Sequence, residues 1–149
     1  MSGPFGSSQW MYASGGFYPY EIDQSVRFND NDSAYLYRTP ASAGNRKTWT
    51  CSFWFKRANL TGSSMWLLGT TVSDASELNL YINGSNLIGV SNQTTTLAQG
   101  AGALRDTAAF YNVVFRFDST QAAAADRLKI YLNGEEVSYA TDNRSSITQ

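Results

Sequence analysis

The sequence contains no histidine, which removes the side chain that most often serves as a general base or binds a transition metal near neutral pH. It has one cysteine, Cys51, so no disulfide can form within the chain and we expect a small buried apolar side chain there. Eleven basic and twelve acidic residues nearly cancel, so we expect no nucleic-acid partner. No apolar run approaches the roughly 20 residues of a membrane helix, and no secretory signal is recognisable. These absences favour a binding or structural role.

Short segments of alternating apolar and polar side chains dominate the chain. Over residues 111–118 the odd positions are aromatic or aliphatic, and over residues 128–132 Leu and Ile alternate with Lys and Tyr. This period of two predicts strands with one buried face. Asn133-Gly134 then offers the two positive-φ positions of a two-residue hairpin turn, and residues 78–90 repeat the pattern around Asn83-Gly84.

Further strands are predicted over residues 25–28, 34–38, 48–56 and 64–69, the first two flanking a polar turn at 29–32. We interpret residues 93–109 as a connection and residues 121–126 as a loop or a single helical turn. Seven to nine short strands predict an all-β fold, an antiparallel β-sandwich or jelly roll.

Trp66 is interpreted as a core residue, and Trp54 suggests that the second face of 48–56 is also partly covered. The residues expected to be largely buried are Trp49, Phe53, Phe55, Val113, Phe115, Phe117, Leu128, Ile130 and Leu132.

The beginning of the chain has a different composition. Residues 1–20 carry no charged side chain and interleave Gly, Ser and Pro with six aromatic residues. Aromatic side chains in a flexible, uncharged segment are typical of an arm that docks into a partner's pockets, whereas the alternative is that they pack on their own domain. We therefore divide the chain into a docking arm, residues 1–24, and a β domain, residues 25–149. The predicted anchors are Phe5, Trp10, Tyr12, Phe17 and Tyr18.

Three of the strand segments together resemble a known family. Residues 50–56 (TCSFWFK), 111–118 (YNVVFRFD) and 128–134 (LKIYLNG) are similar in order and spacing to the LamG-like branch of the concanavalin A-like sandwiches. The resemblance covers about residues 25–139 and implies a concanavalin A-like jelly roll. Members of that family have further strands after the last hairpin, whereas only residues 138–149 remain here. The resemblance thus predicts a sandwich incomplete at its C-terminal end, or one whose edge near Val137 is covered by a neighbouring subunit.

The opening residues carry a second resemblance. Residues 1–12 (MSGPFGSSQWMY), running into residues 25–36, are similar to the N-termini of virion proteins of marine tailed bacteriophages. This implies a virion structural protein, assembled in the host cytoplasm, that forms the N-terminal part of a tail fibre and supports host attachment. It also implies a homotrimer and partners among the tail or capsid proteins. A head decoration or head fibre protein is the alternative that the resemblance leaves open.

Relatives of this fold include glycoside hydrolases, whose catalytic groups are carboxylates. A retaining hydrolase needs two carboxyl groups about 5 Å apart, and laminarinase-type relatives place theirs on one strand as Glu-x-Asp-x-(x)-Glu. No such spacing occurs here, and the adjacent Glu135 and Glu136 point to opposite faces just after a turn. We therefore predict that the chain is not an enzyme.

Two kinds of binding site remain as candidates. Asp30, Asp32 and Asp118 are hard oxygen ligands suited to calcium, but they also suit ordinary Asx turns and caps, so we favour a chain without a cofactor. Trp54, Tyr81 and Tyr131 are candidate platforms for a sugar ring. They support an alternative function, a lectin-like adhesin domain that recognises host surface glycans.

Overall fold

The computed structural model describes residues 24–29, 32–60, 62–70, 77–92 and 95–148, in two units that comprise residues 1–41 and 42–149 and are treated separately below. The predicted division between residues 24 and 25 stays a prediction. Among the described residues, no helix is long and apolar enough to cross a membrane. Six residues with predicted roles lie outside the described residues, namely Phe5, Trp10, Tyr12, Phe17, Tyr18 and Asp30.

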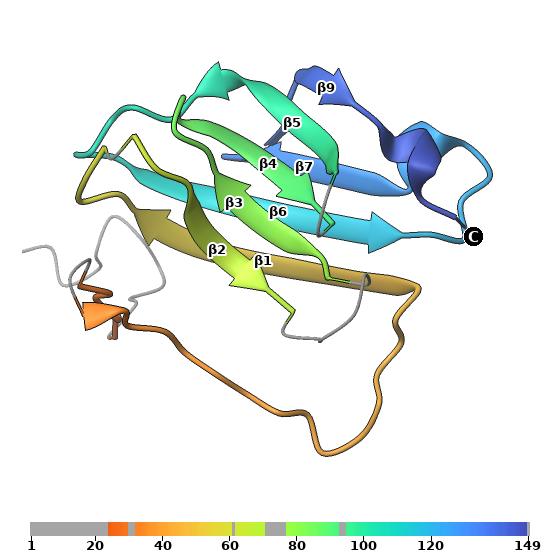
Figure 1. The fold of residues 1–149 in the computed structure, drawn as a ribbon, viewed down its shortest axis with the longest axis horizontal. Coiled ribbons are helices and arrows are strands. Elements are labelled where there is room, and N and C mark those ends of the chain that lie inside the picture. The colour runs from red at the N-terminus through yellow and green to blue at the C-terminus, as the bar shows by residue number, and fades with distance from the viewer. Residues whose placement is uncertain (1–23, 30–31, 61, 71–76, 93–94, 149) are drawn as a thin grey trace, which may run out of the picture. The chain divides into compact units, whose positions relative to one another are not determined.

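The second unit is built from strands, as the alternation predicts (Figure 1). Its strands are β1 (Thr48–Lys56), β2 (Met65–Gly69), β3 (Asn79–Ile82), β4 (Leu87–Ser91), β5 (Thr96–Ala103), β6 (Phe110–Asp118), β7 (Leu128–Leu132), β8 (Glu135–Glu136) and β9 (Tyr139–Asp142). One sheet has the order β1-β6-β7-β8, and the other has the order β2-β3-β4-β5-β9. All neighbouring strands are antiparallel. The predicted antiparallel β-sandwich is confirmed.

The core lies between the two sheets. Four of the residues predicted to be buried are at most 1% exposed, namely Val113, Phe115, Leu128 and Ile130 of the four-stranded sheet. The other five predicted core residues are only partly buried, but they pack against the same cluster. The five-stranded sheet contributes Leu80, Ile82, Ile88, Val90, Leu97 and Ala98 to this cluster.

The two predicted hairpin turns have different geometries. Asn133 and Gly134 have φ values of 52° and 90° and connect β7 directly to β8, so this two-residue turn is confirmed. The prediction of a second such turn at Asn83-Gly84 is wrong. The amide of Asn86 donates to the carbonyl of Asn83 at 2.8 Å, and Asn86, not Gly84, has a positive φ of 67°. The loop is one residue longer because asparagine tolerates this left-handed position.

Two strands were missed in the sequence. β5 lies within residues 93–109, which were predicted to be a connection. β9 lies within residues 138–149, which follow the last predicted hairpin. Both contain small or polar residues and lack strong alternation. At Gly100 in β5, an added Cβ would lie 3.3 Å from Ile88 Cγ2 on the neighbouring β4 and 3.6 Å from Val137 Cβ, so a side chain at this position would be crowded. β9 pairs with β5 and occupies the edge of the five-stranded sheet.

The strands predicted over residues 25–28 and 34–38 are not formed in the described part of the first unit. The amide of Asp32 donates to the carbonyl of Asn29 at 3.2 Å, between the first and last residues of the predicted turn. The side chains beside it are exposed, with Val26 62% and Tyr35 80% accessible. A strand needs a backbone partner, and alternation alone does not provide one.

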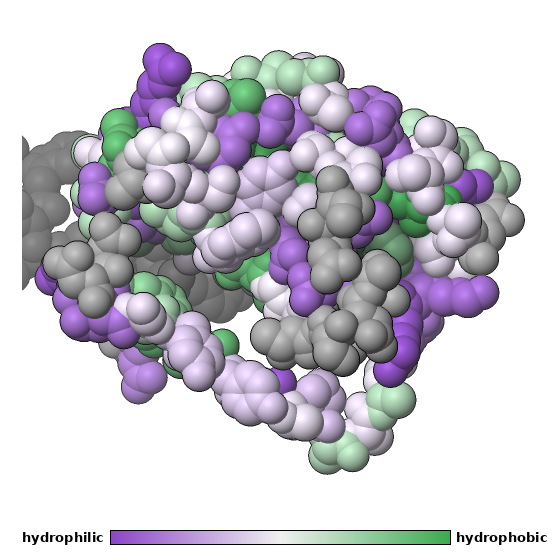
Figure 2. Space-filling model, viewed as in Figure 1, coloured by the Kyte–Doolittle hydropathy of each residue, from purple (hydrophilic) through white to green (hydrophobic). Residues whose placement is uncertain are grey.

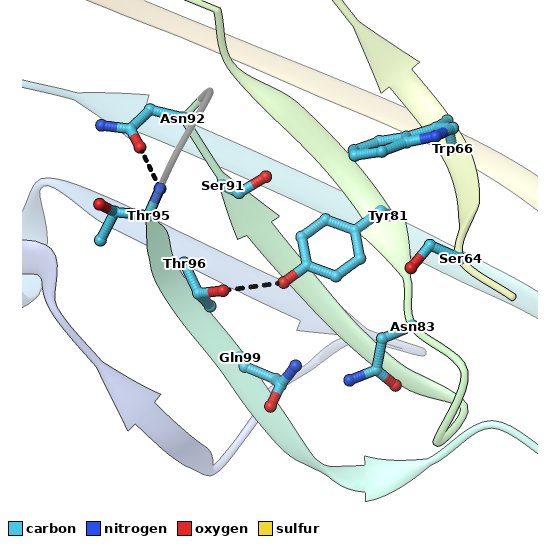
Figure 3. Close-up of a pocket in the computed structure, with 9 residues that line it drawn as sticks. All are labelled: Ser64, Trp66, Tyr81, Asn83, Ser91, Asn92, Thr95, Thr96 and Gln99. Atoms are coloured by element: carbon cyan, nitrogen blue, oxygen red, sulfur yellow. Dashed lines mark hydrogen bonds between the residues drawn. The ribbon is translucent and has the colours of Figure 1, made fainter.

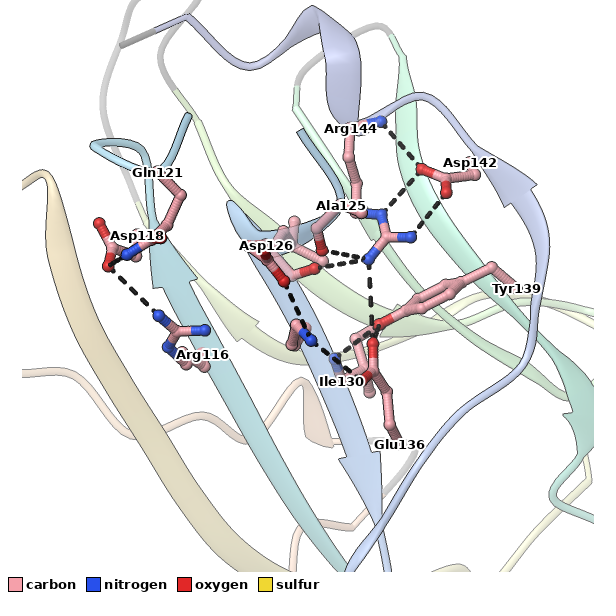
Figure 4. Close-up of polar contacts among 12 residues, drawn as sticks. Arg116, Asp118, Gln121, Ala125, Asp126, Ile130, Glu136, Tyr139, Asp142 and Arg144 are labelled. Atoms are coloured by element: carbon pink, nitrogen blue, oxygen red, sulfur yellow. Dashed lines mark hydrogen bonds and ion pairs between the residues drawn. The ribbon is translucent and has the colours of Figure 1, made fainter. Parts of the chain in front are cut away.

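A polar network fastens the last described segment to β7 (Figure 4). Arg144 donates from Nε and Nη2 to the carboxylate of Asp142 at 2.8 and 2.6 Å. Its Nη1 donates to the carbonyls of Ala125 and Leu128 at 2.6 and 3.1 Å, and its guanidinium lies 4.1 Å from the centre of the Tyr139 ring. Arg144 therefore joins η4 (Arg144–Ser146) to β9, to η3 (Ala124–Asp126) and to the start of β7. The single helical turn η3 confirms one of the two predictions for residues 121–126.

Further charged contacts surround this arginine. Tyr139 Oη accepts a hydrogen bond from the amide of Ile130 at 2.9 Å. Lys129 Nζ lies 3.2 Å from both the Asp126 and the Glu136 carboxylates. The pKa of Lys129 is raised, chiefly by its hydrogen bond to Asp126, while burial raises the pKa of Tyr139. Cations and carboxylates alternate along this end of the sandwich, so the network holds β7 and β9 together.

Candidate functional site

The outer face of the five-stranded sheet carries one row of residues across all its strands. The register places Trp66 beside Tyr81, Tyr81 beside Gly89, Gly89 beside Gln99, and Gln99 beside Thr141. Tyr81 points outward because its neighbours Leu80 and Ile82 belong to the core. Side chains from the consecutive strands β2 to β5, and from β9 near the end of the chain, thus lie on one surface.

The interpretation of Trp66 as a core residue is wrong. Trp66 is 62% exposed rather than part of the core. The reason is that Met65 and Leu67 on either side of it are partly buried against the core, so Trp66 points to the opposite face of β2. Met65, Trp66 and Leu67 are all apolar, so the sequence shows that Trp66 faces away from its two neighbours but carries no signal for which of the two faces is the inner one.

A shallow groove of about 400 Å³ lies on this face (Figure 3). We call it the Trp66–Tyr81 groove. The residues that line it are Ser64, Trp66, Tyr81, Asn83, Ser91, Asn92, Thr95, Thr96 and Gln99. All nine are uncharged at neutral pH. Figure 2 shows this side of the molecule mostly in white and purple, with green limited to small areas.

The Tyr81 ring forms the floor of the groove. A Cβ added at Gly89 would lie 3.0 Å from both Cζ and Oη of Tyr81, so only glycine leaves room for the ring to lie across β4. Tyr81 Oη is 3.2 Å from Thr96 Oγ1 on β5, and Tyr81 is 7% exposed. The Trp66 ring centre is 5.6 Å from that of Tyr81, with the planes inclined by 59°. Tyr81 is thus fixed by its contacts with Gly89 and Thr96. Trp66 lies beside it, and most of the Trp66 side chain is accessible to solvent.

Carboxamide groups flank these two rings. The Asn83 side-chain oxygen accepts hydrogen bonds from the amides of Ser85 and Leu87 at 2.9 and 3.0 Å, and this orients its NH₂ group. Asn92 is oriented in the same way by the amide of Thr95 at 2.8 Å. Figure 3 shows Asn83 and the Gln99 carboxamide on the same side of the Tyr81 ring. The groove therefore offers hydrogen-bond donors and acceptors around an aromatic surface.

The other two predicted platforms are not in this groove. Trp54 and Tyr131 lie on the outer face of the four-stranded sheet, where Trp54 pairs with Asn112 and Tyr131 with Val114. Trp54 is 59% exposed, so the interpretation that this face of β1 is partly covered is wrong. No third layer packs on it among the described residues of the second unit. Of the three predicted platforms, only Tyr81 lies on the five-stranded sheet, where it is beside the exposed ring of Trp66.

The predicted calcium ligands do not form a described cluster. Among the residues that the structure describes, no three His, Cys, Asp or Glu side chains are grouped to hold a metal ion. Asp118 accepts hydrogen bonds from the side chains of Thr120 and Gln121 at 2.6 Å, and these bonds lower its pKa. Asp32 accepts a hydrogen bond from Asn29 in the first unit, at 2.7 Å. Whether a cofactor is bound stays at the level of the sequence prediction.

Comparison with known families assigns the fold. The family model described as the Concanavalin A-like lectin/glucanases superfamily matches residues 10–149. The chain belongs to this superfamily. No curated protein matches the chain, and no solved structure matches it. Membership agrees with the observed sandwich of two antiparallel sheets, and it is compatible with carbohydrate binding.

Proposed function

We propose that this domain binds carbohydrate in the Trp66–Tyr81 groove. The observation that carries the proposal is an exposed tryptophan beside a fixed tyrosine ring, bordered by the carboxamides of Asn83 and Gln99. A sugar ring has an apolar face of C–H groups and a rim of hydroxyls. Aromatic rings cover the first, and amide and hydroxyl groups of the protein bind the second.

We propose binding without hydrolysis. None of the nine described residues that line the groove is Asp or Glu, whereas glycoside hydrolysis needs a pair of carboxyl groups on either side of the scissile bond. Glu136 lies on β8 with its carboxylate 3.2 Å from Lys129, in the sheet opposite the groove. Incubation of the protein with soluble glucans and galactans should therefore release no reducing ends.

The sharpest test compares two tryptophans of similar exposure. Trp66→Ala is expected to weaken binding at least about tenfold, because it removes the accessible ring from the groove. Trp54→Ala is the matched control, since Trp54 is 59% exposed against 62% for Trp66 but lies on the other sheet. Isothermal titration with a panel of soluble glucans and galactans gives the affinities, and circular dichroism checks the folding of each variant. Equal losses in both variants, or no binding by the wild type, would refute the site.

A virion role is proposed for the whole protein, alongside glycan binding by the domain. We propose that it is a structural protein of a bacteriophage particle, attached through residues 1–24 and assembled as a homotrimer. The support is that the first twenty residues carry six aromatic and no charged side chains, and that the opening residues are similar to virion proteins of marine tailed bacteriophages. A glycan-binding domain on a fibre would serve attachment to the host.

Deletion of residues 1–20 tests the attachment. The truncated protein is expected to fold and to keep its glycan affinity, but to be absent from purified particles, because its aromatic anchors are gone. A variant in which a Gly/Ser linker of the same length replaces residues 1–20 controls for chain length. Quantitative immunoblotting of particles measures incorporation, and immunogold labelling separates a tail from a head location. Normal incorporation of both variants would place the anchor elsewhere.

A further inference from the structure

We propose that the Trp66–Tyr81 groove selects uncharged glycans over glycans that carry carboxylate or sulfate groups. This inference rests on the proposed function, because it names the class of ligand for the same site. Its starting point is the described lining, whose polar side-chain atoms belong to hydroxyl and carboxamide groups and to the indole N–H of Trp66. Proteins that recognise carboxylate or sulfate groups in a ligand generally supply a charged partner, most effectively the two-pronged guanidinium of arginine.

Four of the described cations with known contacts serve other parts of the fold. Arg57 is only 2% exposed and donates to the carbonyl of Leu104 and, at 2.8 Å, to Asn86. Arg116 lies on the four-stranded sheet, 3.3 Å from Asp118. Lys129 and Arg144 are paired with carboxylates in the network at the end of the sandwich. None of these four groups lines the groove.

The rings themselves disfavour an anion. The face of an aromatic ring carries a negative electrostatic potential, so a carboxylate or sulfate held over Trp66 or Tyr81 would be repelled. Such a group would also lose water on entering the groove without gaining a cationic partner, which is costly. A neutral hydroxyl loses less, and it is compensated by Asn83, Gln99 and the nearby threonines.

Matched pairs of polysaccharides provide the test. The full chain is titrated with a neutral galactan and a sulfated galactan, and with a neutral β-glucan and its carboxymethylated form. We expect the neutral member of each pair to bind at least about tenfold more tightly. We also expect its affinity to be nearly unchanged between about 50 and 500 mM NaCl, because no ion pair is screened. Tighter binding of the charged members, or affinity that falls steeply with salt, would overturn the inference.

An engineered charge separates the two proposals. Gln99→Lys places an ammonium beside the Tyr81 ring and is expected to bring the affinity for the carboxymethylated glucan to within about threefold of that for the neutral form. Gln99→Met, of similar length but uncharged, is the control and should keep the preference for neutral glycans.

If charged glycans bind better than neutral ones and Trp66→Ala still abolishes binding, the groove is the site but its selectivity is not as inferred. If Trp66→Ala has no effect, the proposed site itself fails.

Discussion

Replacing Phe115 by alanine is expected to lower the free energy of unfolding by about 3–5 kcal/mol, which is typical of a large aromatic side chain removed from a core. Phe115 is 1% exposed and lies in the middle of β6, paired with Cys51 on β1 and Ile130 on β7. Its ring centre is 5.0 Å from that of Trp49. Truncation therefore leaves a cavity between the two sheets, where close packing prevents full relaxation.

Chemical denaturation in urea measures this change, and a second phenylalanine on the same strand is its control. Phe110 begins β6 but is 63% exposed, and Lys56 Nζ lies 5.5 Å from the centre of its ring. Phe110→Ala should cost no more than about 1 kcal/mol, because only an exposed surface contact is lost. If the alanine variant of Phe115 does not accumulate, Phe115→Leu offers a milder truncation. A loss at Phe115 no larger than the loss at Phe110 would contradict the assigned core.

Replacing Arg144 by methionine is expected to cost about 2–3 kcal/mol, since hydrogen bonds to a charged group contribute more than neutral ones. Arg144 is 6% exposed, and its loss leaves the carbonyls of Ala125 and Leu128 without this donor. Methionine keeps much of the apolar stem, so the effect reports mainly on the guanidinium. Arg105→Met, at an exposed arginine, is the matched control and should be nearly neutral. Equal urea midpoints for the two variants would show that the network adds no stability.

The same variant changes the response to acid. Hydrogen bonds from the Arg144 side chain lower the pKa of Asp142 below its ordinary value. A carboxyl group whose pKa is lower in the folded state stabilises the fold above its unfolded pKa, and this contribution is lost as the pH falls through the folded value. The wild type should therefore lose stability below about pH 4, and Arg144→Met should show a shallower decline in that range. Asp118 retains its own lowered pKa in both proteins, so some decline persists.

Local patterns in the sequence were sufficient for much of the framework. The alternation over residues 111–118 and 128–132 predicts which side of β6 and β7 is buried, because successive side chains on a strand must point to opposite faces. Asn133-Gly134 predicts its turn because few residue pairs adopt positive φ at both positions. These features depend on neighbouring residues only. For the same reason the pattern failed at β5, where Gly100 lies close to Ile88 of the neighbouring strand β4.

The groove depends on contacts that no local pattern encodes. Sequence alternation shows that Trp66 and Leu67 face opposite ways, but it does not show which face is covered by a second sheet. Tyr81 lines the groove because the register sets it beside Trp66 and over Gly89. The sequence by itself determined an antiparallel β protein, its strongest strands and its central core. Only the tertiary structure decided which aromatic rings meet on the surface, because the register between paired strands and the face covered by the second sheet are not set by any local pattern.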